Sequence, residues 1–136
     1  MALIYAIILT EVRWRMKFQY FLSEKEGLLV VSLKGSLDDH QKPLVEKCLN
    51  EAVSKAPAGA ILLMEGIADF PADGFRCFSL LLRGLKAKCK VVRVTGLKEK
   101  ARKTLVDKGL LSASEFRETL ADAAKEVAEQ IKASNG

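Results

Sequence analysis

The chain has 136 residues, of which 49% are hydrophobic and 29% charged, and its formal net charge is +5 at pH 7. That length fits one domain with a core of its own, and the composition excludes a collagen-like or low-complexity chain. The apolar residues 1–9 are too few to span a membrane, which takes about 20, and they lack the flanks of a signal peptide.

Apolar and polar residues alternate from Glu11 to Tyr20, which predicts a strand with one buried face. A polar turn at 23–27 leads to the apolar run 28–33, a second strand that reads as buried on both faces. The short connection predicts an antiparallel hairpin. Residues 41–54 carry an apolar stripe at helical spacing.

The second half of the chain repeats strand and helix signals. Strands are expected at 60–64 and 89–94, helices at 74–86, 97–109 and 119–133, and a short extended piece at 115–118. Gly109 is the stop signal of the middle helix. The last helix has Leu120, Ala124, Val127 and Ile131 on its apolar face.

The predicted order is β-β-α-β-α-β-α-α, which is the α/β class with a mixed sheet of four to five strands and packed helices. Helical crossovers between strands imply parallel pairing. We assign residues 16–136 to this domain. Residues 1–15 are an N-terminal extension, for which an added strand, pairing across a homodimer and contact with a membrane all remain open. We favour the homodimer, because an apolar edge strand needs cover.

Two short motifs stand at matching places in this order. The second strand runs into Gly35-Ser36-Leu37-Asp38, and the third helix ends at Gly109-Leu110. In this order and spacing, residues 17–131 resemble the STAS domain family (sulfate transporter and anti-sigma factor antagonist). The resemblance implies the same fold and a regulatory role without catalysis. Free-standing bacterial members bind an anti-sigma factor kinase and so release a sigma factor.

The resemblance breaks at the family's regulatory loop. That loop is typically Asp-Ser-Ser/Thr-Gly-Leu, and a hydroxyl in it is phosphorylated. This chain has Pro71, Ala72, Asp73, Gly74 and Phe75 there. Since no hydroxyl remains at these positions, we expect no phosphorylation switch within the loop.

Asp73 has three interpretations that the sequence leaves open. It is a helix N-cap; it imitates a phosphoserine; or it contacts another partner or ligand. Imitation would be partial, because a phosphate has about −1.5 to −2 charges and three acceptor oxygens, whereas a carboxylate has one charge and two oxygens.

We expect the partner surface at the carboxyl ends of neighbouring parallel strands, where such sheets usually bind. The candidate partner is a protein, and the resemblance implies an anti-sigma factor or a related kinase. The candidate residues are Ser36, Asp38, Asp39, Ala72, Asp73, Gly74 and Arg76.

Residues 83–103 hold nine Lys or Arg side chains and one acid, Glu99, and so net +8. Such a segment is either an ordinary solvated surface or a binding module for an anion, a nucleotide or a lipid headgroup. The candidate ligands are Lys98, Lys100, Arg102 and Lys103. Gly96 opens a strand–helix turn that is either structural or presents N–H groups to an anion. No aromatic residues interleave the segment, which disfavours nucleic acid as a partner.

Catalytic and metal-binding signals are weak. His40 is the only histidine, and Asp38 and Asp39 beside it are typical of caps near a helix start. The cysteines Cys48, Cys77 and Cys89 are odd in number and lack metal-site spacing, so we expect reduced thiols and a cytoplasmic protein. We predict no enzymatic activity, no metal and no cofactor.

Overall fold

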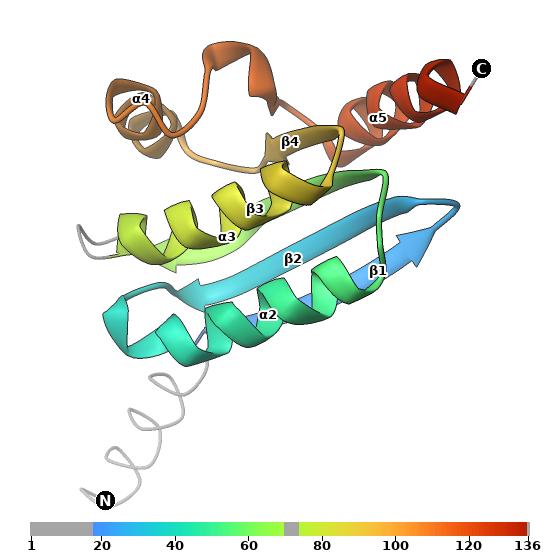
Figure 1. The fold of residues 1–136 in the computed structure, drawn as a ribbon. Coiled ribbons are helices and arrows are strands. Elements are labelled where there is room, and N and C mark those ends of the chain that lie inside the picture. The colour runs from blue at the N-terminus through green and yellow to red at the C-terminus, as the bar shows by residue number, and fades with distance from the viewer. Residues whose placement is uncertain (1–17, 70–73, 136) are drawn as a thin grey trace, which may run out of the picture.

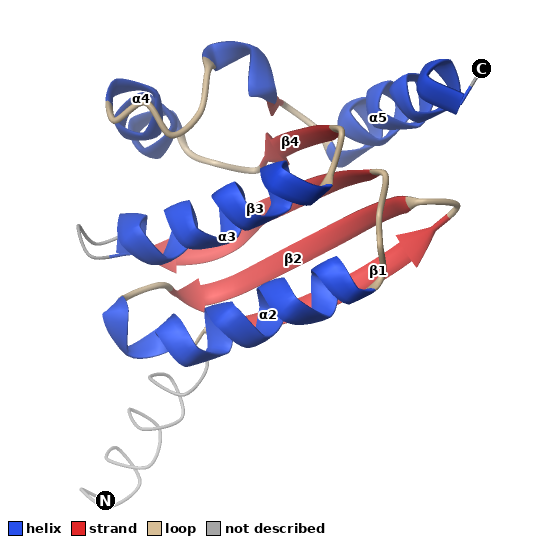
Figure 2. Ribbon diagram, viewed as in Figure 1, coloured by secondary structure: helices blue, strands red, loops and turns tan. Residues whose placement is uncertain are grey.

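The computed structural model describes residues 18–69 and 74–135. One five-stranded sheet has the order β1-β2-β3-β4-β5, and helices pack on both of its faces (Figure 1, Figure 2). The strands are β1 (Gln19–Lys25), β2 (Leu28–Ser36), β3 (Gly59–Asp69), β4 (Val91–Thr95) and β5 (Phe116–Arg117). The helices are α2 (Lys42–Ser54), α3 (Gly74–Lys88), α4 (Glu99–Asp107) and α5 (Leu120–Asn135), with 3-10 helices η1 (Asp39–Gln41) and η2 (Ala113–Glu115). The predicted α/β class is confirmed.

The hairpin of β1 and β2 is antiparallel, as predicted, but its turn is tighter than the expected five residues. Lys25 pairs with Leu28, so only Glu26 and Gly27 form the turn, with φ of 54° and 86°. Two successive positive φ angles are typical of the type I′ turn that matches the twist of a hairpin.

β1 continues through residues 23–25, which were expected in the turn. Their side chains are exposed, and an edge strand accepts exposed polar side chains. Of the strand predicted over 11–20, residues 11–17 lie outside the described part of the chain, and β1 begins at Gln19.

The pairs β2–β3, β3–β4 and β4–β5 are all parallel, which confirms the pairing predicted from the helical crossovers. The piece predicted at 115–118 is strand β5, in which Phe116 pairs with Val94 and Arg117 with Thr95. The sheet is therefore mixed, with one antiparallel pair at one edge and a two-residue strand at the other.

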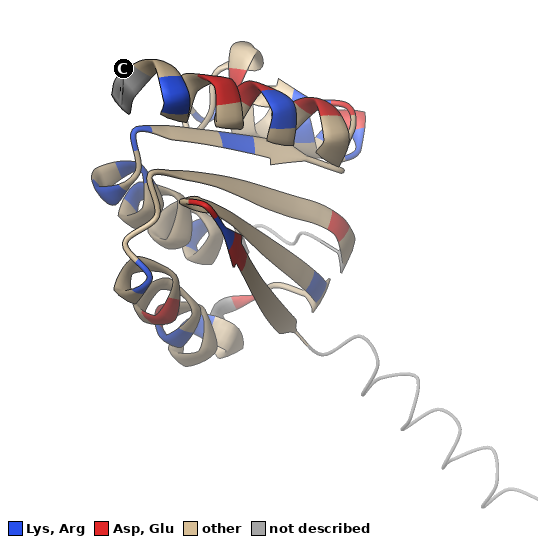
Figure 3. Ribbon diagram, turned by 90° about the vertical axis from the view of Figure 1, so that its right-hand side faces the viewer, with Lys and Arg blue, Asp and Glu red and all other residues tan. Residues whose placement is uncertain are grey.

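The larger core lies between the sheet and helices α2, α3 and α4, and the smaller one lies between β3, β4 and α5. Figure 3 shows α5 on the sheet face opposite α2 and α3. Because α5 covers β3 and β4, the second face of β2 is not fully covered. Leu29, Val31 and Leu33 are buried, but Leu28 and Val30, which alternate with them, are half-buried. The prediction of a strand buried on both faces is wrong in this respect.

The apolar face of α5 also differs from the prediction. Ala123, Val127 and Ile131 are buried and follow one another at the helical spacing of four residues. Leu120, the first residue of the helix, is 36% exposed, and Ala124 is half-buried. Ala123 thus takes the place expected for Ala124, because it stands four residues before Val127 and so lies on the same buried stripe.

Candidate functional site

The carboxyl ends of β2 and β3 meet the start of α3 (Figure 1). The Cα of Ser36 at the end of β2 pairs with that of Asp69 at the end of β3. The Cys77 thiol on α3 donates a hydrogen bond to the Asp38 carbonyl oxygen, with 3.3 Å between Sγ and O. The segment that follows β2 and the described start of α3 therefore lie side by side and form one surface. We call it the carboxyl-end surface, and its described side chains are Ser36, Asp38, His40, Lys42 and Arg76.

Asp38 shapes this surface through local hydrogen bonds. Its carboxylate oxygen Oδ1 accepts a bond from the His40 N–H at 2.9 Å, and its carbonyl oxygen accepts one from the Gln41 N–H at 3.0 Å. These bonds close the turn of η1, which is the usual task of an Asp before a helix. Asp38 consequently fixes the position of η1 against α3, because the same carbonyl also accepts the bond from Cys77.

Two cationic side chains flank an apolar spot on the carboxyl-end surface. A cavity of about 390 Å³ opens between α2 and α3, and Lys42, Arg76, Cys77 and Leu80 line it. Lys42 and Arg76 are exposed, and Leu80 is an exposed large hydrophobic side chain. Such a mixture suits a partner that offers carboxylates around an apolar side chain.

The remaining predicted partner residues are only partly placed. Asp39 lies in η1, and Gly74 begins α3. Ala72 and Asp73 lie outside the described residues, so the three interpretations of Asp73 stay predictions.

The basic segment 83–103 is divided between the two ends of β4, which are about 13 Å apart. Lys88 and Lys90 precede the strand, whereas Lys98, Lys100, Arg102 and Lys103 follow it at the start of α4. Lys86 forms an ion pair with Glu115. Figure 3 shows the Lys and Arg positions spread over several elements. The cations of the segment therefore do not form one patch.

The four side chains predicted to bind an anion do not lie in one site. Lys98 and Lys100 line one cavity of about 370 Å³, whereas Arg102 lines another of about 200 Å³. The Arg102 guanidinium also lies over the Phe116 ring, with 5.0 Å from Cζ to the ring centroid. Lys103 is exposed.

Gly96 has φ of +86°, and a Cβ atom there would lie 2.6 Å from the Glu65 backbone nitrogen. Close packing of the backbone therefore requires a glycine here, and this explains the residue as part of a structural turn without a bound anion.

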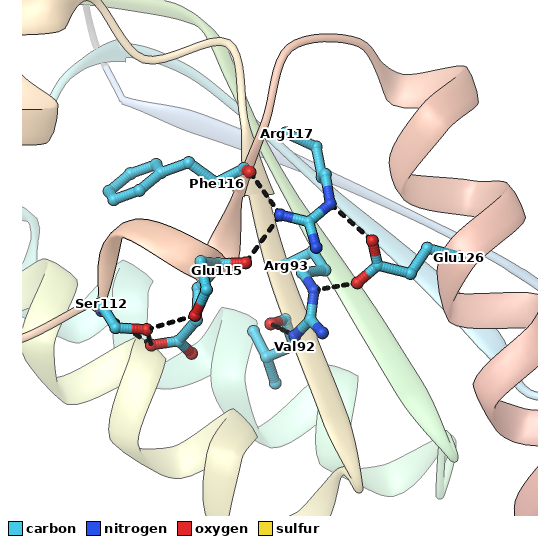
Figure 4. Close-up of polar contacts among 8 residues, drawn as sticks. Val92, Arg93, Ser112, Glu115, Phe116, Arg117 and Glu126 are labelled. Carbon is cyan, nitrogen blue, oxygen red and sulfur yellow. Dashed lines mark hydrogen bonds and ion pairs between the residues drawn. The ribbon is translucent and has the colours of Figure 1, made fainter.

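An ion-pair cluster that sequence reasoning missed joins β4, β5 and α5. The Glu126 carboxylate accepts hydrogen bonds from Arg117 Nε and Arg93 Nε, each at 2.5 Å (Figure 4). The bond from Arg117, together with that from Arg93 and both positive charges, holds the pKa of Glu126 below its ordinary value, against a smaller opposing effect of burial. One signal was present in the sequence: Arg93 is a lone charged residue within an apolar strand, and such a residue needs a partner.

The surroundings of two of the thiols disfavour nucleophilic chemistry. Burial raises the pKa of Cys48 to about 12, with a smaller effect from Glu51, and burial also raises the pKa of Cys89. Both thiols therefore stay protonated at neutral pH, and a thiol is a poor nucleophile. Within the described residues, no group of three or more His, Cys, Asp or Glu side chains is placed to hold a metal ion. The helices of that part include none with the length and apolar character of a membrane span.

Comparison with known proteins gives matches in structure only. No family model matches this chain, and no curated protein matches its sequence. An anti-sigma factor antagonist from Mycobacterium paratuberculosis has a TM-score of 0.68 at 19% identity, over 82% of this chain and 95% of that one. Phosphorylated SpoIIAA, a cell fate determinant of Bacillus, has a TM-score of 0.60 at 20% identity, over 82% of this chain and 99% of that one.

An anion transporter also contains a part with a similar fold. The murine anion transporter Slc26a9 in its inward-facing state has a TM-score of 0.66 at 12% identity, over 90% of this chain and 24% of that one. At identities of 12% to 20% these matches show a common fold. The mixed sheet and its helices therefore form a STAS-like domain, the fold of the anti-sigma factor antagonists.

Proposed function

We propose that this chain is a non-catalytic regulatory module that binds a protein partner through the carboxyl-end surface. The observation that carries the proposal is the junction of the end of β2 with the start of α3, made by the Cys77–Asp38 hydrogen bond. It brings the Gly35–Asp38 motif next to the helix that follows the family's regulatory loop. The structural likeness to anti-sigma factor antagonists supports an anti-sigma factor or a related kinase as the partner.

The proposed module lacks the usual switch. Pro71, Ala72 and Asp73 provide no hydroxyl group, so its interface would not be toggled by phosphorylation of those residues. A cytoplasmic location accompanies this proposal, since such partners act there. Replacing Asp73 by Ser tests the imitation of phosphoserine: partner binding at the level of the unchanged protein would argue against it.

The proposal is tested with the purified anti-sigma-type kinases of the source organism and calorimetric titration. Arg76→Glu reverses an exposed charge on the carboxyl-end surface, and we expect it to raise the dissociation constant about tenfold. Lys132→Glu is the matched control, because Lys132 is exposed on α5, on the opposite face of the sheet.

If Arg76→Glu and Lys132→Glu raised the dissociation constant equally, the result would contradict an interface on the carboxyl-end surface. Absence of binding by every anti-sigma-type kinase of the organism would contradict the proposed class of partner. Circular dichroism of both variants shows whether the fold is kept.

A homodimer through the N-terminal extension also stays a proposal, because residues 1–15 lie outside the described part of the chain. It would leave the carboxyl-end surface accessible only if the two surfaces do not overlap.

A further inference from the structure

A second cavity lies between the carboxyl ends of β3 and β4 and the first turns of α3 and α4. Its volume is about 370 Å³, which is within the range of small-molecule sites. The apolar side chains that line it include Met64, Ile67, Phe75 and Leu97. Met64 is buried, and the other three are half-buried against the larger core. A ligand with an apolar body would remove their remaining surface from water, which favours binding.

The rim of this cavity is cationic. Lys98 and Lys100 line it and are exposed, and neither has an ion-pair partner among the described residues. The Lys108 ammonium lies over the Phe75 ring, 5.5 Å from its centroid. By contrast, Lys86 and Arg93 of the same basic segment are paired with Glu115 and Glu126. Lys98 and Lys100 thus carry positive charge beside the cavity that no ion pair among the described residues neutralises, and such charge attracts an anion.

Glu65 also lines the cavity and limits the charge that fits there. Among the described lining residues, two lysines and one glutamate give a formal net charge of +1. A ligand with several negative charges would be repelled by Glu65, because like charges at short distance disfavour binding. The lining therefore matches one negative charge better than a polyphosphate.

The wall that carries the lysines is held in place by close packing. At Gly96 the connection from β4 to α4 approaches the Glu65 backbone so closely that no side chain fits between them. The Leu110 N–H donates a hydrogen bond to the Leu105 carbonyl oxygen at 3.0 Å, which helps to close the other end of α4. A cavity whose walls are already held in place loses little conformational entropy when it binds a ligand.

We propose that this cavity binds a small amphipathic monoanion, with its apolar body against Met64, Ile67, Phe75 and Leu97 and its carboxylate at Lys98 and Lys100. The site adjoins the proposed partner surface at the start of α3, where Phe75 precedes Arg76, but it uses other side chains and does not rest on the proposed function. Its ligand class is narrower than the anion, nucleotide or headgroup expected from the basic segment alone.

The test is a titration of the full ¹⁵N-labelled chain with octanoate, octanol and inorganic phosphate as separate probes. We expect octanoate to shift the amide signals of residues around the cavity and to bind at least about tenfold more tightly than the other two. Octanol lacks the charge and phosphate lacks the apolar body, so each omits one of the two inferred interactions.

Two variants and one control locate the site. Lys98→Ala with Lys100→Ala should weaken octanoate binding about tenfold, and Ala101→Phe should abolish it by filling the cavity, which Ala101 lines. Lys88→Ala with Lys90→Ala removes two exposed cations at the other end of β4 and should change nothing.

Equal effects of the two double variants would overturn the site, as would octanoate binding that survives Ala101→Phe in a folded protein. Binding of phosphate as tight as that of octanoate would overturn the amphipathic ligand class. If Ala101→Phe does not fold, the comparison of the two double lysine variants alone decides.

Discussion

Gly96 and Gly109 both have positive φ, but their surroundings differ. A Cβ atom at Gly96 would meet the Glu65 backbone at 2.6 Å, whereas one at Gly109 would meet nothing within 4 Å. Gly96→Ala therefore adds a steric conflict to the conformational cost, and Gly109→Ala adds only the latter, about 1–2 kcal/mol. We expect Gly96→Ala to lower the free energy of unfolding by about 2 kcal/mol more than Gly109→Ala. Urea denaturation of both variants measures the difference.

Equal losses of stability in the two glycine variants would contradict this expectation, because they would show that the backbone of β3 at Glu65 shifts to make room for the added Cβ atom. The same comparison bears on the proposed cavity, because the close approach at Gly96 fixes one of its walls. A folded Gly96→Ala protein with a displaced turn should also bind octanoate more weakly.

Single residues were predictable from sequence where the reason is local. Gly109 after a helix follows from backbone geometry alone, and the structure has it there with φ of 73°. The bond from Cys77 to Asp38 joins residues 39 positions apart, and no local pattern specifies it. Asp38 was recognised as a cap, but its contact with α3 depends on how the sheet brings two loops together.

The ion-pair cluster holds α5 against β4 and β5 and makes that contact depend on pH. The hydrogen bonds and charges of Arg117 and Arg93 lower the pKa of Glu126 in the folded protein. Its contribution to stability is therefore present above the ordinary pKa of Glu, about 4.3, and is lost as the pH falls through the lower folded value. Glu126→Gln should reduce the free energy of unfolding at pH 7 by about 1–2 kcal/mol.

The expected signature is a gap between the unchanged protein and Glu126→Gln that closes on acidification. Thermal unfolding from pH 7 to pH 3 measures it. Glu129→Gln serves as the control, since Glu129 is exposed on the same helix, and it should leave stability unchanged within about 0.5 kcal/mol. A gap that stays constant over this range would contradict the assignment to the Glu126 carboxylate.

Elements were predictable where their periodicity is strong. The stripe of α2 and the apolar runs of β2 and β3 identify them, but their ends depend on tertiary pairing: β3 reaches Asp69 because β2 extends beside it to Ser36. The two residues of β5 have no periodicity of their own and are held by pairing with β4. Glu126 could not be matched with Arg93 and Arg117 without the position of α5.

At the scale of the whole molecule, the order of strand and helix signals was enough to predict a mixed sheet and to suggest the STAS fold. That order did not predict which cationic side chains lie close together in space, because the basic segment 83–103 is divided between the two ends of β4. The cavity proposed to bind an amphipathic anion combines side chains from β3, α3 and α4, so it exists only in the folded chain. Of the four cations predicted as anion ligands, only Lys98 and Lys100 line this cavity, and that selection depends on the tertiary structure.

The assignment of residues 16–136 as the domain predicts that a chain starting at Met16 folds without the extension. The described residues already supply a five-stranded sheet with helices on both faces, and Phe18, near the new start, is buried in the larger core. We expect its unfolding temperature to match that of the full chain within a few degrees. Phe18→Ala in the shortened chain is the positive control and should cost about 3–5 kcal/mol.

The same pair of chains tests the proposed homodimer. Light scattering during size-exclusion chromatography should give twice the chain mass for residues 1–136 and the monomer mass for residues 16–136. The reason is that the apolar residues 1–9 would be buried between two copies, and without them the edge of the sheet at β1 carries exposed polar side chains at residues 23–25. Equal association of both chains would place the interface on the domain itself, and a monomer in both would remove the homodimer.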